Sequence, residues 1–217
     1  MGLTITISTF VVGLAVLTGG AHWFVHGSVR LAKVLRVSQL MIGLTVVAFG
    51  TSAPELFLDV TAATRGAVDL AFGDLVGSNI ANIGLILGVA AVSRPLVLQM
   101  RLLRVELPLV IGLTIVAIGT SLPELATSVT ATIRRQADIS VGNVLGSNVF
   151  NILFVMGLCA QIKPLPVRPE SLQFDLPDML GSVVLVGVLV MRGQRLGRVG
   201  GALLLIGYGT YLWNKAV

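Results

Sequence analysis

The hexapeptide GTSAPE, residues 50–55, lies within an apolar run at 38–64 that is long enough to cross a membrane. GTSLPE at 119–124 repeats it. Hydrocarbon gives hydroxyls, a carboxylate and an interrupted backbone no hydrogen-bond partners, so these residues are unfavourable at such a depth. The two hexapeptides therefore indicate two polar sites in the middle of membrane-spanning segments.

Proline decides the local structure of the first hexapeptide. Pro54 has no N–H group and disfavours helical backbone at Ala53. We therefore expect the helix to break near Gly50, which frees backbone carbonyl groups around Ala48 for another partner.

The composition indicates a polytopic, all-α membrane protein. The 217 residues are 55% hydrophobic and 12% charged, with a mean hydropathy of +0.94, whereas soluble domains carry about 25% charged residues. Lys and Arg gather in short links, as membrane topology requires, so the net charge of +5 does not indicate nucleic-acid binding. The predicted spans are 5–29, 38–64, 70–93, 107–133, 139–162, 176–191 and 199–214.

The chain contains an internal repeat. A shift of 69 positions aligns the segment that starts at Ile42 with the segment that starts at Ile111, and about half of the positions are identical, without a gap, as far as Pro95 and Pro164. Duplicated polar signatures in the middle of spans are typical of secondary transporters. No GxSxG elbow or nucleophile–base pair indicates a hydrolytic enzyme.

Each hexapeptide collects oxygen ligands within one helical turn. Thr51 and Glu55 are four residues apart and share a helix face, and an all-oxygen set suits hard cations such as Ca²⁺ and Na⁺. Alternatively, Ser52 with Glu55, and Ser121 with Glu124, fit a capping box that only satisfies a helix start. The depth in the membrane favours the cation site.

A second signature follows in the next span of each repeat, as Gly-Ser-Asn at 77–79 and 146–148. Asn82 and Asn151 come four residues after the serines, on the same helix face. Small polar residues also serve helix–helix hydrogen bonding in membranes. Because the signature accompanies GTSxPE in both repeats, we favour a shared site.

Two acidic residues break the symmetry of the repeat. Asp59 corresponds to Ser128, and Asp74 corresponds to Asn143. Asp59 either lines an access path or lies at a helix end that faces water. Asp74 is expected behind the ligands or at the mouth of the cavity.

The paired motifs GTSxPE and GxxxGSNxxN, each present twice, closely resemble the α-repeats of the sodium/calcium exchanger family, within the calcium/cation antiporters, of bacterial or archaeal type. The resemblance implies inverted repeats and exchange of Ca²⁺ for Na⁺ across the cell membrane, by alternating access at a midplane site and without a cofactor. It also implies one cation cluster, formed by Glu55, Glu124, Thr51, Ser52, Thr120, Ser121, Ser78, Ser147, Asn82, Asn151, Ala48 and Ala117.

Asn151 stands where some members of the family carry aspartate. Only two carboxylates then remain in the cluster, which leaves coupling to Na⁺ and coupling to protons both open. A Ca²⁺/H⁺ or other cation/H⁺ exchanger is the alternative to a Ca²⁺/Na⁺ exchanger.

The chain is shorter than the family pattern of ten spans in two sets of five. Residues 1–108 correspond to helices 1–3 of the first repeat and the start of its fourth, and residues 109–217 to helices 2–5 of the second. Three spans are therefore expected to be missing near 109–111. A truncated, non-transporting remnant is the further alternative.

Charge supports an original ten-span topology. Three crossings inserted near residue 110 place eleven of the 15 Lys and Arg on one side, and Arg65, Lys163, Arg168 and Lys215 on the other. The positive-inside rule then predicts an N-terminus outside the cell.

Overall fold

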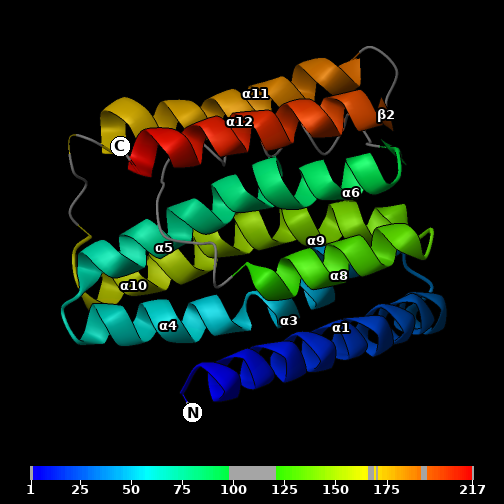
Figure 1. The fold of residues 1–217 in the computed structure, drawn as a ribbon, viewed down its shortest axis with the longest axis horizontal. Coiled ribbons are helices and arrows are strands. Elements are labelled where there is room, and N and C mark those ends of the chain that lie inside the picture. Colours follow the sequence, from blue (N-terminus) through cyan, green and yellow to red (C-terminus); the bar gives the residue numbers. More distant parts are fainter. Residues whose placement is uncertain (1, 98–120, 166–168, 170, 192–194, 217) are drawn as a thin grey trace.

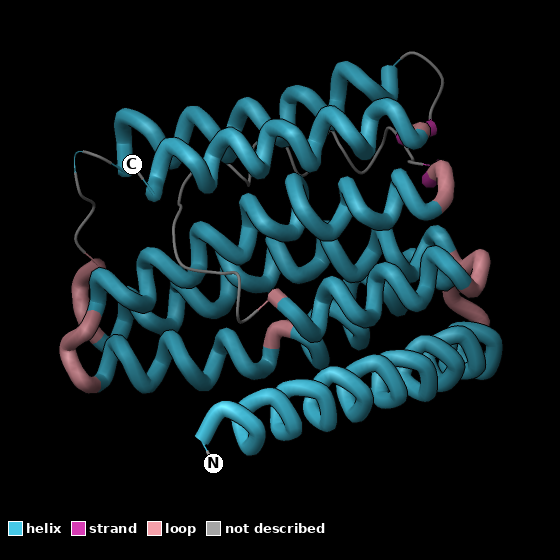
Figure 2. Tube along the Cα trace, in the orientation of Figure 1, coloured by secondary structure: helices cyan, strands magenta, loops and turns pink. Residues whose placement is uncertain are grey.

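The computed structural model describes residues 2–97, 121–165, 169, 171–191 and 195–216 as a layered bundle of helices (Figures 1 and 2). Within these ranges, strand structure is limited to β1 (Leu96–Val97) and β2 (Arg195–Leu196). The two strands pair antiparallel, with Leu96 opposite Leu196. The predicted all-α class is confirmed.

The first helix, α1 (Gly2–Leu35), lies along one side of the bundle (Figure 1). Its span Thr4–Leu35 is apolar, yet only 6% of its most apolar window is buried inside the protein. A long apolar helix with this exposure is suited to contact with lipid rather than with water.

The first hexapeptide lies at a bend. The run consists of α2 (Gln39–Ile42), η1, a π-helix (Gly43–Val47), α3 (Ala48–Thr51) and α4 (Ala53–Thr64). Its two parts meet at 48°. Ser52, with φ −87° and ψ 7°, is the residue that leaves the helix. The break thus falls two residues after Gly50, and the expected loss of helical structure at Ala53 is wrong, because the first helical turn tolerates a proline such as Pro54.

The next helix of each repeat is continuous but contains a π-helical segment. In the first repeat, α5 (Val68–Ala81), η2 (Asn82–Leu87) and α6 (Gly88–Ser93) form one span. The second repeat has α8 (Leu122–Ile133), α9 (Ala137–Phe150), η3 (Asn151–Val155) and α10 (Met156–Ile162). Figure 1 shows that α4 and α8 run in opposite directions, as do α5 and α9.

Glycines let α9 pack directly on the backbone of the first repeat. A Cβ at Gly142 would lie 2.9 Å from Gly43 Cα, and one at Gly146 would lie 2.5 Å from the carbonyl oxygen of Leu44. Small residues four apart permit such close helix contacts in membranes. This packing brings Ser147, the residue after Gly146, next to Thr51.

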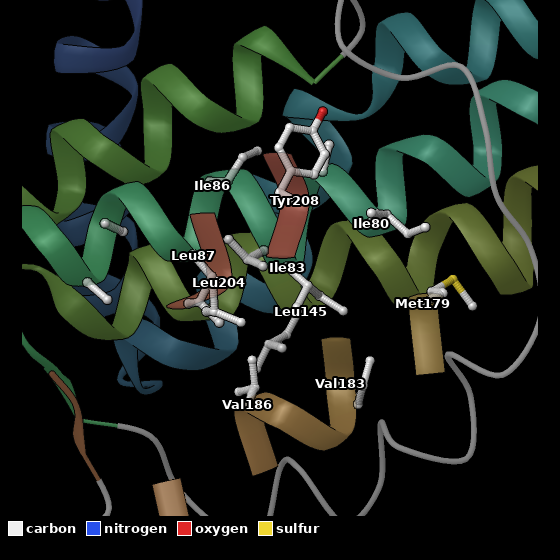
Figure 3. Packing of buried hydrophobic residues seen from close by; sticks show 14 of the residues in the cluster. Ile80, Ile83, Ile86, Leu87, Leu145, Met179, Val183, Val186, Leu204 and Tyr208 are labelled. Carbon is white, nitrogen blue, oxygen red and sulfur yellow. The ribbon is translucent and has the colours of Figure 1, made fainter. Parts of the chain in front are cut away.

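The remaining elements, η4 (Ser171–Asp175), α11 (Leu176–Met191) and α12 (Arg198–Ala216), form the layer farthest from α1 (Figure 1). Leu204 and Tyr208 of α12 belong to the main hydrophobic core with Ile83 and Leu87 of η2 and Val183 of α11 (Figure 3). This apolar layer covers one side of the span Val68–Ser93, which carries the first copy of the second signature.

Fewer elements qualify as spans than the seven predicted. In the described ranges, three helices are long and apolar enough to cross a membrane, Thr4–Leu35, Val68–Ser93 and Ala137–Ile162, or four if the bent run Gln39–Thr64 counts as one. α11 has only 16 residues. The first half of the predicted span 107–133, the boundary at 108/109 and the segment expected to be missing near 109–111 lie outside the described residues.

The loops fall at two opposite ends of the bundle. The C-terminal ends of α1, α6 and α8 lie at one end, and those of α4 and α10 lie at the other (Figure 1). Arg94 and Arg134 follow α6 and α8, whereas Arg65 and Lys163 follow α4 and α10. Basic side chains are thus present at both ends.

Candidate cation-binding site

The two glutamates of the repeated hexapeptides meet in the interior. Glu55 lies in the first turn of α4 and Glu124 in the first turn of α8, and their side chains are 0% and 1% exposed. Their carboxyl groups lie within interaction range of each other. The structure therefore brings together the two residues on which the predicted site depends.

A serine from one repeat holds the glutamate of the other. Ser52 Oγ donates a hydrogen bond of 2.8 Å to Glu124 Oε1, and both residues are buried. Neither Ser52 nor Ser121 makes a side-chain capping bond to its own helix. The capping-box alternative is wrong for both serines, because the Ser52 hydroxyl donates across the repeat interface and Ser121 Oγ has no hydrogen-bond partner among the described residues.

Thr51 is also bound across the interface. Its Oγ1 donates to Asn143 Oδ1 at 2.9 Å and lies 3.5 Å from Ser147 Oγ. Asn143 Nδ2 in turn donates to Ser128 Oγ at 3.0 Å. Asn143 is therefore a positioning residue that joins the two hexapeptide helices, a role that we did not predict from the sequence.

The asparagines of the second signature form another connection between the repeats. Asn82 Nδ2 donates to Asn148 Oδ1 at 2.8 Å. Asn82 and Asn151 are the first residues of η2 and η3, so each repeat has a π-helical segment at the predicted ligand. π-Helical segments are frequent at functional sites. The sequence signal for Asn148 was its place in Gly-Ser-Asn.

Several buried atoms of the predicted residues lack hydrogen-bond partners in the part of the chain that the structure describes. They are both carboxylate oxygens of Glu55, Oε2 of Glu124, Oγ of Ser121, Oδ1 of Asn82, and Oδ1 and Nδ2 of Asn151. Buried polar groups are normally satisfied. A hard cation is attracted to just such oxygens.

Positive side chains are absent from the helices around these oxygens. The stretches 37–64, 66–93, 121–133 and 136–162 contain no Lys or Arg. Among the described residues, no three His, Cys, Asp or Glu side chains converge closely enough to hold a metal ion. An ion between Glu55 and Glu124 would therefore also need hydroxyl, amide or carbonyl oxygens.

The structure describes some of the other predicted ligands, whereas others lie outside the described residues. Ser78 and Ser147 are buried, whereas Thr120 and Ala117 lie outside the described residues. The carbonyl oxygen of Ala48 accepts the Ser52 N–H at 3.0 Å. It is therefore not freed by the break as expected, because the bend begins only after Thr51.

Asp59 and Asp74 are both fully buried. The alternative in which Asp59 lies at a helix end facing water is therefore wrong. Its carboxyl group interacts with that of Asp74 on the neighbouring helix α5.

A helical membrane protein with an acidic, oxygen-lined centre at the bend of related helices has the architecture of an ion transporter. The sequence model of one family, described as "Sodium/calcium exchanger protein", matches residues 5–109 and again residues 103–217. The chain belongs to this sodium/calcium exchanger family, whose members are membrane transporters and not enzymes.

Individual relatives agree over nearly the full chain. The inner membrane protein YrbG of Escherichia coli is 27% identical, with 97% of this chain and 96% of YrbG covered. The sodium/calcium exchanger MaX1 of Methanosarcina acetivorans is 25% identical, with 97% and 98% covered. The alignment with YrbG extends over 313 positions, more than the 217 residues of this chain.

The fold is similar to that of solved sodium-calcium exchanger structures. One structure of NCX_Mj soaked with Na⁺ and Sr²⁺ superimposes with a TM-score of 0.86 at 24% identity, with 95% of this chain and 97% of that chain covered. Another, soaked with Na⁺ and Ca²⁺, also gives a TM-score of 0.86. These similarities concern the fold alone.

Proposed function

We propose that this protein is a secondary antiporter that exchanges Ca²⁺ for Na⁺ at a site between Glu55 and Glu124. The observation that carries the proposal is the meeting of two buried carboxylates from different repeats, with unpartnered oxygens on both. Two carboxylates balance the charge of one Ca²⁺. The family to which the chain belongs supports the choice of ions.

Competition for the same oxygens would couple the two ions. Two buried carboxylates that lie close together carry a large free-energy cost when both are ionised and no cation is bound between them. Release of Ca²⁺ is therefore favourable only when Na⁺, or another cation, takes its place. Alternating access would follow if the loaded site opens to one side at a time, with the exposed helix α1 as the moving element.

The repeats would be inverted, which the opposite directions of α4 and α8 support. We also propose that three spans are absent near 109–111, because the alignment with YrbG contains positions that this chain lacks. The missing positions favour the alternative function, a truncated exchanger that retains the cation site but does not transport.

Transport by the full chain in sealed liposomes tests the proposal. ⁴⁵Ca²⁺ uptake should follow an imposed Na⁺ gradient, and Glu55→Gln should abolish it. Asp138→Asn changes an exposed carboxylate in the first turn of α9 and serves as the control. Uptake driven only by a pH gradient would indicate proton coupling instead, and binding without uptake would indicate a remnant.

We further propose a location in the cell membrane, with the N-terminus outside. The Arg94 and Arg134 loops, at one end of the bundle, would then face the cytoplasm. Arg65 and Lys163, at the other end, would face outside. This assignment rests on the split of eleven against four Lys and Arg that the ten-span topology gives, with Arg94 and Arg134 among the eleven.

A further inference from the structure

One face of the span that carries the first copy of the second signature receives α12. Gly84, Gly88 and Ala91 lie on this face, at spacings of four and three residues, and all three are buried. A Cβ at Gly84 would lie 2.9 Å from Tyr208 Cβ, and one at Gly88 would lie 3.1 Å from the carbonyl oxygen of Gly201. The small residues therefore let α12 approach the helix backbone directly.

The equivalent face of the second repeat is open. At the shift of 69 positions its members are Leu153, Gly157 and Ala160, which we call the Gly157 face. All three residues are exposed. A Cβ at Gly157 would meet no heavy atom of the described residues within 4 Å. The glycine that receives a helix in the first repeat thus has an equivalent that receives none in the part of the chain that the structure describes.

The two spans differ in burial along their whole length. In Val68–Ser93, 83% of the most apolar window is buried inside the protein, whereas in Ala137–Ile162 only 39% is buried. Phe154, which stacks on Phe150, is 50% exposed beside the Gly157 face. The second repeat therefore lacks the layer that α11 and α12 form on the first.

Relatives contain residues that could form this second layer. The alignment with YrbG extends over 313 positions against the 217 residues of this chain, so at least 96 residues of YrbG have no counterpart here. A membrane span needs about 20 residues. The additional length is therefore sufficient for a pair of helices like α11 and α12, together with one further span and the loops.

We propose that the Gly157 face is a docking surface for a separate membrane polypeptide, which carries a pair of apolar helices equivalent to α11 and α12 and places a small residue opposite Gly157. Apolar helices gain no hydrophobic free energy when they leave lipid, so close packing at small residues stabilises such a complex. The inference rests on the proposed absence of spans near 109–111 and not on the identity of the transported ions.

Co-purification tests the docking surface. The probe is the part of Escherichia coli YrbG that aligns with no residue of this chain, expressed with an affinity tag together with the full chain. Both should co-purify in detergent, and Gly157→Leu should lower the recovery of the full chain with the probe about tenfold, because the added side chain prevents close approach. Gly209→Leu, at an exposed position of α12 with open space among the described residues, is the control and should leave the recovery unchanged.

Photo-crosslinking identifies the occupant of the face. Leu153→p-benzoylphenylalanine should cross-link to the probe on irradiation, and Leu203→p-benzoylphenylalanine, at an exposed position of α12, should not. A cross-link from position 153 to a second copy of this chain would overturn the inference in favour of a homodimer. Absence of the probe from the purified chain, or equal recovery with Gly157→Leu, would overturn it in favour of lipid.

These measurements are independent of the proposed function, because none of them records transport. If the complex forms at the Gly157 face but ⁴⁵Ca²⁺ uptake does not follow a Na⁺ gradient, the docking surface is supported and the proposed exchange is wrong. If uptake follows the Na⁺ gradient without the probe and the probe does not bind, the exchange is supported and the docking surface is wrong.

Discussion

At the scale of single residues, each repeat is completed by groups from the other. Ser52 donates a hydrogen bond to Glu124, which follows 72 positions later in the sequence. Thr51 donates one to Asn143, which follows 92 positions later. Hydrogen bonds to charged or buried groups are costly to remove. The carboxylates are therefore positioned mainly by contacts between the repeats.

Ser52→Ala should weaken Ca²⁺ binding about tenfold or more, because a hydrogen bond to a charged group contributes about 1.5–3 kcal/mol. Isothermal titration calorimetry of the purified protein measures this change. Thr45→Ala, which removes an exposed hydroxyl bonded to its own helix, is the matched control. Unchanged affinity in Ser52→Ala would show that the bond to Glu124 does not position the ligand.

Asn143→Ala should lower the free energy of unfolding by about 1–3 kcal/mol, because it removes two buried hydrogen bonds, one from the Thr51 hydroxyl and one to the Ser128 hydroxyl. Thermal unfolding in detergent measures the effect. Asn214→Ala, at an exposed position of α12, should change the midpoint little. Equal midpoints for the two variants would contradict the positioning role of Asn143.

The resemblance of the duplicated motif to the sodium/calcium exchanger family predicted that Glu55 and Glu124 lie in one cluster. It did not predict the bonds of Asn143 and Asn148. Their partners lie in the other repeat, and the register between the repeats depends on packing that a sequence comparison does not contain.

At the scale of helices, the bend and the glycine contacts place the ligands. The bend at Ser52 directs α4 away from α3 by 48°, and Gly142 and Gly146 allow α9 to approach η1 and α3. The proline allowed prediction of a break to within two residues. The π-helical segments at Asn82 and Asn151 were not predicted, since no residue pattern in the motifs marks the change of helix type.

Gly146→Ala should destabilise the protein by about 1–3 kcal/mol, since the added methyl group would clash with the backbone of Leu44. It should also weaken Ca²⁺ binding by moving Ser147 away from Thr51. Gly157→Ala places the same methyl group in open space on α10 and is the control. Comparable melting midpoints for the two variants would rule out close packing at Gly146.

At the scale of the whole molecule, the candidate cation site lies in the interior, between the two ends of the bundle that carry the loops. The composition was sufficient to predict an all-α membrane protein, since hydrocarbon requires every spanning segment to satisfy its own backbone. The layer of α11 and α12 on η2 was not predicted. Its contacts, such as Gly201 against Gly88, join segments that no repeat relates.

The proposed orientation predicts which end faces the cytoplasm. In a Cys159→Ala background, Arg65→Cys should react with an impermeant maleimide applied to intact cells, and Lys33→Cys should react only after permeabilisation. Both positions are exposed, and Cys159 is the sole native cysteine. The reverse pattern would contradict an N-terminus outside the cell.

Anomalous X-ray scattering from crystals grown with Ca²⁺ tests whether Glu55 and Glu124 bind one ion together. We expect a Ca²⁺ peak about 2.3–2.6 Å from a carboxylate oxygen of Glu55 and from one of Glu124. Absence of a peak between the two glutamates at saturating Ca²⁺, or a peak in contact with only one of them, would contradict it.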